Sequence, residues 1–261
     1  MPLVSTPEPS RDPFDHTPPP PPPPRSEPIS NLPGVIVALA GLMTAIHAVD
    51  ALVLSQRETV TMLLTFAFLP ARYLAGAAES IPGGEGARVW SFLTYAFLHG
   101  SWMHLIFNML WMVIFGGAVA RRFGALRFLL LSATCAVAGA AFYLLFHIGE
   151  VAPMVGASAA ISGHMAAATR FVFQLGGPLG AIRRSDPGAY RVRAAGFREA
   201  LAHRQVVGFL AVWFGINLLF GLVTPGILGE GGAIAWEAHI GGFVAGFVLF
   251  SLFDPLSARR V

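Results

Sequence analysis

Four polar residues in apolar stretches of the sequence have the chemical groups that acyl transfer requires. Ser158 has only Gly or Ala at the two positions on either side, and such small neighbours let another helix or a substrate backbone come close. His239 can take a serine proton, while His104 and Asn108 can donate hydrogen bonds to the oxyanion that develops on a substrate carbonyl. Taken alone, Ser158 favours a plainer interpretation, a helix-contact serine that bonds to its own backbone.

The composition indicates which environment surrounds these groups. Of the 261 residues, 55% are hydrophobic and 12% are charged, which is typical of a helical protein with several membrane-spanning segments. All 17 basic residues are arginines, and most lie in short loops beside apolar segments, which favours topology signals over a nucleic-acid-binding face. Cys135 is the single cysteine, so the sequence predicts neither an intrachain disulfide nor a metal site built on several cysteines.

Six apolar segments are each near the ~20 residues that a helix needs to cross a bilayer. We therefore predict an all-α polytopic membrane protein, a bundle of six transmembrane helices in residues 34–255, followed by a short cytoplasmic tail at 256–261. The six segments run from about Gly34 to Leu54, Trp90 to Val119, Ala125 to His147, Pro153 to Phe173, Gln205 to Val223 and Ala233 to Phe253.

Two other segments do not fit a membrane-spanning helix. Residues 1–33 are rich in proline and lack the apolar core of a signal peptide, so we predict a disordered cytoplasmic tail. Residues 55–89 are too polar and too interrupted to cross, and we predict an interfacial or re-entrant element on one face.

Arginines mark one side of the predicted membrane domain. They follow the second, fourth and sixth apolar segments, whereas residues 148–152 and 224–232 on the other side contain none. The positive-inside rule therefore places both termini in the cytoplasm. The second, fourth and sixth segments then enter from the outer side, so the four polar residues fall in one layer of the outer half of the bilayer. Ser158 lies ~8 Å from the outer end of its segment.

The other histidines and the nearest carboxylate are assigned non-catalytic roles. Glu237 precedes His239 by two residues, about 200° around a helix, so we predict a Ser–His pair without a third carboxylate. His164 falls on a different helix face from the serine. His99 lies in a turn, where we predict a structural hydrogen bond. We interpret the remaining histidines as packing, span-end or exposed residues: His16, His47, His147 and His203.

Three motifs occur in order along the chain. The first runs from His99 to Asn108, the second is Gly156–Ser158, and the third is Ala238–Gly246. The second is similar to a Gly-x-Ser-Gly nucleophile motif, and the third to an Ala-His-x-x-Gly-x-x-x-Gly motif. Together they resemble the rhomboid family of intramembrane serine proteases, in its bacterial six-helix form, over residues 34–255.

The resemblance implies a role for each matching residue. It makes Ser158 the nucleophile and His239 the general base. It makes His104, Asn108 and the backbone N–H of Ser158 the oxyanion site.

The resemblance also assigns structural elements around the site. It makes Gly242 and Gly246 the close-packing face between the sixth and fourth helices, which agrees with the way Gly-x-x-x-Gly lets backbones approach. It makes residues 55–89 an outer loop that lies partly in the membrane, and residues 224–235 a mobile cap over the site.

The sequence departs from the family pattern at three places. Ala159 stands where the family has a glycine after the serine, and Ser162 stands where many members have an aromatic ring that stacks on the histidine. Residues 117–120 lack the acidic residues that are common in the second helix.

We therefore predict a serine endopeptidase that cleaves transmembrane-segment substrates near the extracytoplasmic side of a bacterial inner membrane. Its partners are transmembrane proteins and membrane lipid, and it needs neither a metal nor a cofactor. One alternative is a non-catalytic rhomboid-like protein that binds membrane-protein clients. Another is a transporter, although the sequence has no internal repeat and its polar layer lies off-centre.

Overall fold

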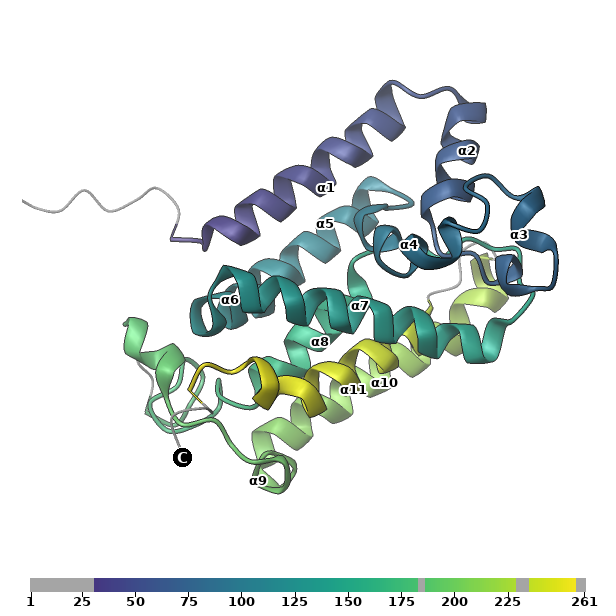
Figure 1. Cartoon of the computed structure of the whole chain (residues 1–261). Coiled ribbons are helices and arrows are strands. Elements are labelled where there is room, and N and C mark those ends of the chain that lie inside the picture. Colours follow the sequence, from purple (N-terminus) through teal and green to yellow (C-terminus); the bar gives the residue numbers. More distant parts are fainter. Residues whose placement is uncertain (1–30, 183–185, 229–234, 257–261) are drawn as a thin grey trace, which may run out of the picture. The chain divides into compact units, whose positions relative to one another are not determined.

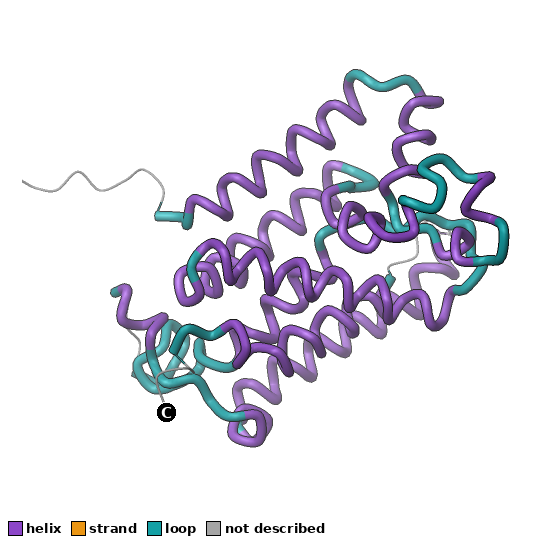
Figure 2. The backbone as a smooth tube through the Cα atoms, viewed as in Figure 1, coloured by secondary structure: helices purple, strands orange, loops and turns teal. Residues whose placement is uncertain are grey.

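The computed structural model describes residues 31–182, 186–228 and 235–256. Within these ranges the secondary structure is helical, apart from an isolated antiparallel bridge between Phe68 and Met154 (Figures 1 and 2). The predicted disordered tail falls almost wholly outside the described residues, as do 229–234 of the predicted cap and 257–261 of the C-terminal tail.

Helices occupy all six of the predicted apolar segments. Within the described ranges, four helical runs are long and apolar enough to cross a membrane: Gly34–Leu52, Trp102–Phe123, Ala125–His147 and Trp236–Phe253. The protein is therefore an all-α polytopic membrane protein, while the count of six crossings stays a prediction. The corresponding elements are α1 (Gly34–Leu52), α5 (Trp102–Trp111), the π-helical turn η3 (Met112–Gly116), α6 (Gly117–Phe123), α7 (Ala125–His147), α8 (Ser158–Thr169), α10 (Arg204–Leu228) and α11 (Trp236–Phe253).

The connection between α1 and α5 contains short helices and packs onto the rest of the domain. Ser55 and Glu58 form a capping box at its first helix, and Arg72 is fully buried with its guanidinium donating to the carbonyls of Leu64, Pro82 and Gly84. None of these helices is long enough to span a bilayer. They are α2 (Gln56–Phe66), η1 (Pro70–Tyr73), α3 (Ala77–Ser80), α4 (Ala87–Thr94) and η2 (Tyr95–Phe97).

The sequence-based prediction places the start of the second apolar helix too early. Its helix starts at Trp102 rather than near Trp90, because the chain turns after η2 and Ser101 caps a new helix. The Ser101 hydroxyl accepts a hydrogen bond from the His104 backbone N–H at 3.1 Å, which satisfies one of the free donors of the first turn.

The fourth predicted segment also begins too early, because residues 153–157 are not helical. Gly156 has φ +118°, a conformation that side chains other than hydrogen disfavour, and its N–H donates to the Tyr95 carbonyl at 3.0 Å. The helix α8 therefore starts at Ser158 itself. The prediction that five helical residues precede the serine is therefore wrong. The 12 residues of α8 extend over ~18 Å.

The helix α8 packs closely against α7 and α11 through glycines (Figure 1). A Cβ at Gly242 would overlap the backbone of Ala159, and one at Gly246 would overlap the backbone of Gly163. Small residues thus allow α11 to approach α8 backbone to backbone. This contact fixes the separation between the residues that begin the two helices.

Candidate active site

The first residue of α8 and an imidazole of α11 are joined by a hydrogen bond. Ser158 Oγ lies 2.8 Å from His239 Nε2, and both side chains are partly buried. The distance is within the range that proton transfer from a serine hydroxyl requires. Ser158 is also at a helix N-terminus, where the backbone N–H groups have no partner within the helix and where the helix dipole favours negative charge.

The other nitrogen of the His239 ring is bonded to α10. Its Nδ1 lies 2.6 Å from Asn217 Oδ1, and Asn217 Nδ2 donates to the Trp213 carbonyl at 2.8 Å. A carbonyl oxygen accepts only, so the Trp213 bond orients the Asn217 amide with its oxygen toward His239. The amide oxygen also accepts only, so His239 carries its proton on Nδ1. Its Nε2 is then left as the acceptor for the Ser158 hydroxyl.

Sequence reasoning missed Asn217. Its only sequence signal is an amide within an apolar helix, where polar side chains usually face a cavity or a partner. The group that binds the imidazole is thus an amide and not a carboxylate. Glu237 lies elsewhere, as predicted, with its carboxylate oxygen 3.2 Å from His147 Nε2 at the end of α7.

His104 and Asn108 converge on Gly156, in the non-helical segment that leads into Ser158. A Cβ on Gly156 would lie 2.7 Å from His104 Nε2 and 3.6 Å from Asn108 Nδ2. Asn108 Nδ2 is buried and has no hydrogen-bond partner in the described part of the chain. A buried donor without a partner is costly, so a donor retained in this state next to a serine suggests a group that acts on a ligand.

A cavity of about 260 Å³ lies beside Ser158, and His104 is not among the residues that line it. Ser158 and His239 line it together with Asn108 and Asn217, so all four polar groups face the same space. Its other walls are mainly apolar and come from α5, α8 and α10: Trp111, Ile161, Ser162, Met165, Phe209, Val212, Trp213 and Ile216. Such a cavity accepts apolar side chains.

A second serine–histidine contact lies between α7 and α8. Ser132 Oγ is 2.8 Å from His164 Nε2, but the serine also lies 2.7 Å from the Phe128 carbonyl, which can only accept. The Ser132 proton is therefore directed to that carbonyl, and His164 donates from Nε2. His164 is almost fully buried and neither residue lines the cavity of Ser158. This arrangement suits a structural hydrogen bond rather than a nucleophile and its base.

Two further histidines are buried: His47, predicted as a packing or span-end residue, and His99, predicted to make a structural hydrogen bond. The His99 ring contacts the His104 ring edge to face at 5.2 Å, and the His47 ring contacts Trp102 in the same manner at 4.7 Å. The ring nitrogens of His99 make no hydrogen bond of normal geometry among the described residues, but the ring interacts with the Phe97 backbone. The structural hydrogen bond of His99 therefore stays a prediction.

Comparison with known proteins identifies the fold that carries this arrangement. The family model of the Rhomboid domain matches residues 86–254, which include every residue of the candidate site. The chain belongs to the rhomboid family. Rhomboid membership and the apolar helices together make it an integral membrane protein.

Two proteins named as rhomboid proteases are similar to part of this rhomboid chain. The Rhomboid protease GlpG of Salmonella choleraesuis (strain SC-B67) is 27% identical over 172 residues, which are 66% of this chain and 51% of the relative. The Rhomboid protease GlpG of Haemophilus influenzae is 34% identical over 89 residues, which are 30% of this chain and 46% of the relative. The chain thus spans about half the length of the relatives that it matches.

The two departures from the rhomboid pattern near Ser158 have distinct surroundings. The Ala159 side chain is buried away from the cavity, close to where a Cβ on Gly139 of α7 would lie, so its methyl group does not face the reacting groups. The Ser162 hydroxyl lines the cavity and donates to the Ser158 carbonyl at 2.8 Å. With no aromatic ring at that position, the amide of Asn217 is the group that orients the His239 imidazole.

Proposed function

We propose that this protein is an intramembrane serine endopeptidase that hydrolyses peptide bonds in transmembrane segments of other proteins. The observation that carries the proposal is the 2.8 Å contact between Ser158 Oγ and His239 Nε2 inside a cavity that also contains an unpaired donor, Asn108 Nδ2. A nucleophile, a base and a preorganised donor in one cavity are the components of acyl transfer. The names of the relatives support the same activity.

In the first step, Ser158 Oγ attacks the carbonyl carbon of the scissile bond while His239 Nε2 takes the hydroxyl proton. The imidazolium is held by the Nδ1–H bond to Asn217. The carbonyl oxygen becomes an oxyanion, and Asn108 Nδ2, the Ser158 N–H and the His104 ring are the donors that stabilise it.

In the second step, the C–N bond breaks and His239 returns the proton to the leaving amine. An ester between the substrate acyl group and Ser158 remains. Water, deprotonated by the same imidazole, then attacks this ester, and the serine hydroxyl forms again as the carboxylic acid leaves. No carboxylate is needed, because the Asn217 amide sets the tautomer of His239.

The substrate class follows from the surroundings of the cavity. Its walls are largely apolar and lie on α5, α8 and α10, so an apolar peptide segment is the ligand that the cavity accepts most readily. Ser158 begins α8, whose ~18 Å length is shorter than the ~30 Å hydrocarbon core. With the C-terminal end of α8 at one surface, the serine lies in the opposite half of the bilayer, below the surface of that half. The arginine distribution favours the extracytoplasmic half, in a bacterial inner membrane with both termini in the cytoplasm.

The test is proteolysis by the purified full chain, reconstituted with a transmembrane substrate that contains a helix-destabilising residue near its outer end. We expect cleavage by the wild type and a fall of at least about a thousandfold for Ser158→Ala, since removal of a nucleophile leaves only binding and oxyanion stabilisation. Ser132→Ala is the matched control, because it removes the hydroxyl of the other serine–histidine contact. Equal cleavage by wild type and Ser158→Ala would refute the proposal.

A further inference from the structure

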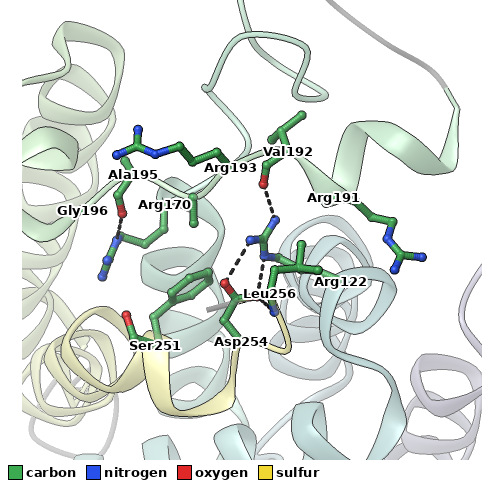
Figure 3. A pocket seen from close by; sticks show the side chains of 12 residues that line it. Arg122, Arg170, Arg191, Val192, Arg193, Ala195, Gly196, Ser251, Asp254 and Leu256 are labelled. Atoms are coloured by element: carbon green, nitrogen blue, oxygen red, sulfur yellow. Dashed lines mark hydrogen bonds and ion pairs between the residues drawn. The ribbon is translucent and has the colours of Figure 1, made fainter. Parts of the chain in front are cut away.

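A second cavity, of about 410 Å³, lies at the opposite end of α8 from Ser158. It is bounded by the ends of α6, α8 and α11 and by residues 191–196, and we call it the arginine pocket. Its lining contains four arginines and one carboxylate, Asp254. Figure 3 shows Arg170 and Arg193 on one side of the pair that Arg122 forms with Asp254, and Arg191 on the other side.

Structural partners already neutralise one of the four arginines. Arg122 binds Asp254 through Nε and Nη2, both at 3.0 Å, and its Nη1 donates to the carbonyls of Tyr190 and Val192. Both side chains of the ion pair are almost fully buried. This bidentate pair therefore fixes the wall of the pocket and has little charge left for a ligand.

The guanidinium of Arg170 is hydrogen-bonded to backbone carbonyls and not to a carboxylate. The residue is 5% exposed, and its Nε and Nη1 donate to the carbonyls of Ala195 and Phe247, which satisfy hydrogen bonds but bring no negative charge. Across the described ranges, no carboxylate is in ion-pair contact with Arg170, although Asp254 and Glu199 act on its charge from farther away and offset part of it. A buried cation that is only partly offset is stabilised further when an anion enters the adjoining space.

The two remaining arginines lie at the edge of the pocket and are exposed. Arg193 forms an ion pair with Glu199 at 2.8 Å, but the two side chains are 60% and 43% exposed, so this pair is weak and exchangeable. Arg191 has no carboxylate in contact in the parts of the chain that the structure describes. Both guanidinium groups are thus available to a ligand with several acceptor oxygens.

Apolar side chains adjoin the charged lining. Phe197 and Leu201 lie one helical turn apart on α9 (Phe197–Ala202), directly after the lining residue Gly196, and both are exposed. Leu252 of α11 is 78% exposed beside the lining residue Ser251. A pocket whose guanidinium groups outnumber the nearby carboxylates, beside exposed apolar side chains, suits a ligand with an anionic head and an apolar tail.

We infer that the arginine pocket binds a phosphate group, the chemistry that several guanidinium groups recognise best in a site of this size. A phospholipid headgroup and a free phosphate compound share this chemistry, and the adjoining apolar residues favour the lipid. The site is at the other end of α8 from the catalytic candidate, ~18 Å away by helix length, so it does not depend on proteolysis.

The experiment is isothermal titration of the purified full chain, in a nonionic detergent, with three probes. These are a short-chain phosphatidylglycerol, the phosphatidylcholine with the same acyl chains, and inorganic phosphate. We expect the anionic lipid to bind at least about tenfold more tightly than the zwitterionic one, a difference of ~1.4 kcal/mol. Comparable binding of inorganic phosphate would identify a free phosphate compound as the source, and its absence would identify the lipid.

The variant Arg191→Gln with Arg193→Gln removes two exposed charges from the pocket edge and leaves the buried arginines in place. We expect it to weaken binding of the anionic probe about tenfold, as the loss of charge-assisted hydrogen bonds predicts. The matched control is Arg127→Gln with Arg204→Gln, since these exposed arginines lie at the same end of the bundle but do not line the pocket. The inference is wrong if neither anion binds the wild type, or if the two double variants bind the anionic probe equally.

Discussion

Asn217 Oδ1 lies 2.6 Å from His239 Nδ1, and this contact determines which nitrogen of the imidazole faces Ser158. The Trp213 carbonyl fixes the amide, the amide oxygen holds the Nδ1 proton, and Nε2 is left with a lone pair for the serine hydroxyl. The orientation of the base thus depends on α10, a helix that contributes neither the nucleophile nor the base.

Replacement of Asn217 tests this role. We expect Asn217→Ala to lower kcat about fivefold with little change in KM, because the hydrogen bond that sets the tautomer is worth ~1 kcal/mol. Cleavage of a transmembrane peptide by the reconstituted protein gives both constants. Asn217→Asp, which keeps an acceptor oxygen for Nδ1–H, should restore part of the rate. An Ala variant with the wild-type kcat would show that His239 is oriented by other contacts.

Replacement of Asn108 should lower kcat without lowering the free energy of unfolding. Asn108→Ala removes an oxyanion donor, so we expect kcat to fall by ~10²–10³. It also removes a buried amide nitrogen that has no partner in the described structure, so the free energy of unfolding should not decrease. Steady-state kinetics measures the change in kcat, and thermal unfolding in the same detergent measures the change in stability. A variant that loses activity only because it unfolds would contradict the assignment of Asn108 to the oxyanion site.

Ser132 and His164 should behave as structural residues. Ser132→Ala leaves the buried His164 Nε2 donor without its acceptor, so we expect a loss of ~1–3 kcal/mol in stability and an unchanged kcat per folded molecule. Thermal denaturation followed by active-site titration separates the two quantities. Abolished activity in a folded Ser132→Ala protein would instead favour this pair as the catalytic one.

The packing of α11 on α8 predicts a position-specific response to alanine. A methyl group at Gly246 meets the backbone of Gly163, so Gly246→Ala should destabilise the protein by ~1–3 kcal/mol or more. Gly41 of α1 is the control, since a Cβ there meets no atom within 4 Å and alanine favours helix. Thermal unfolding should therefore show a lower midpoint for Gly246→Ala and an unchanged or higher one for Gly41→Ala. Equal midpoints would mean that α11 can move away from α8 at no cost.

The sequence was informative about most of the site because polar residues in apolar helices are few and their helical phase is readable. Ser158, His239 and Asn108 do line one cavity, and Glu237 does turn away from His239. Asn217 was missed because its contact depends on how α10 lies against α11, which no local pattern specifies. The second serine–histidine contact, which involves Ser132, is hidden for the same reason.

The helix starts were predicted less well, although their signals were present. Pro153 and Gly156 both disfavour helix, and hydropathy alone nevertheless extended the fourth segment through them. Ser101 is a standard N-cap that marks the true start of α5. Residues 224–228 were assigned to a mobile cap, but they belong to α10, which continues to Leu228.

The most direct test of the account is covalent labelling of the folded protein with a fluorophosphonate, followed by mass spectrometry of the modified peptide. A serine whose hydroxyl is activated by a histidine reacts with this probe, and an ordinary membrane serine does not. We predict one adduct, on Ser158, that is lost in His239→Ala and retained in Ser132→Ala. An adduct on Ser132, or labelling of Ser158 that does not depend on His239, would contradict the account.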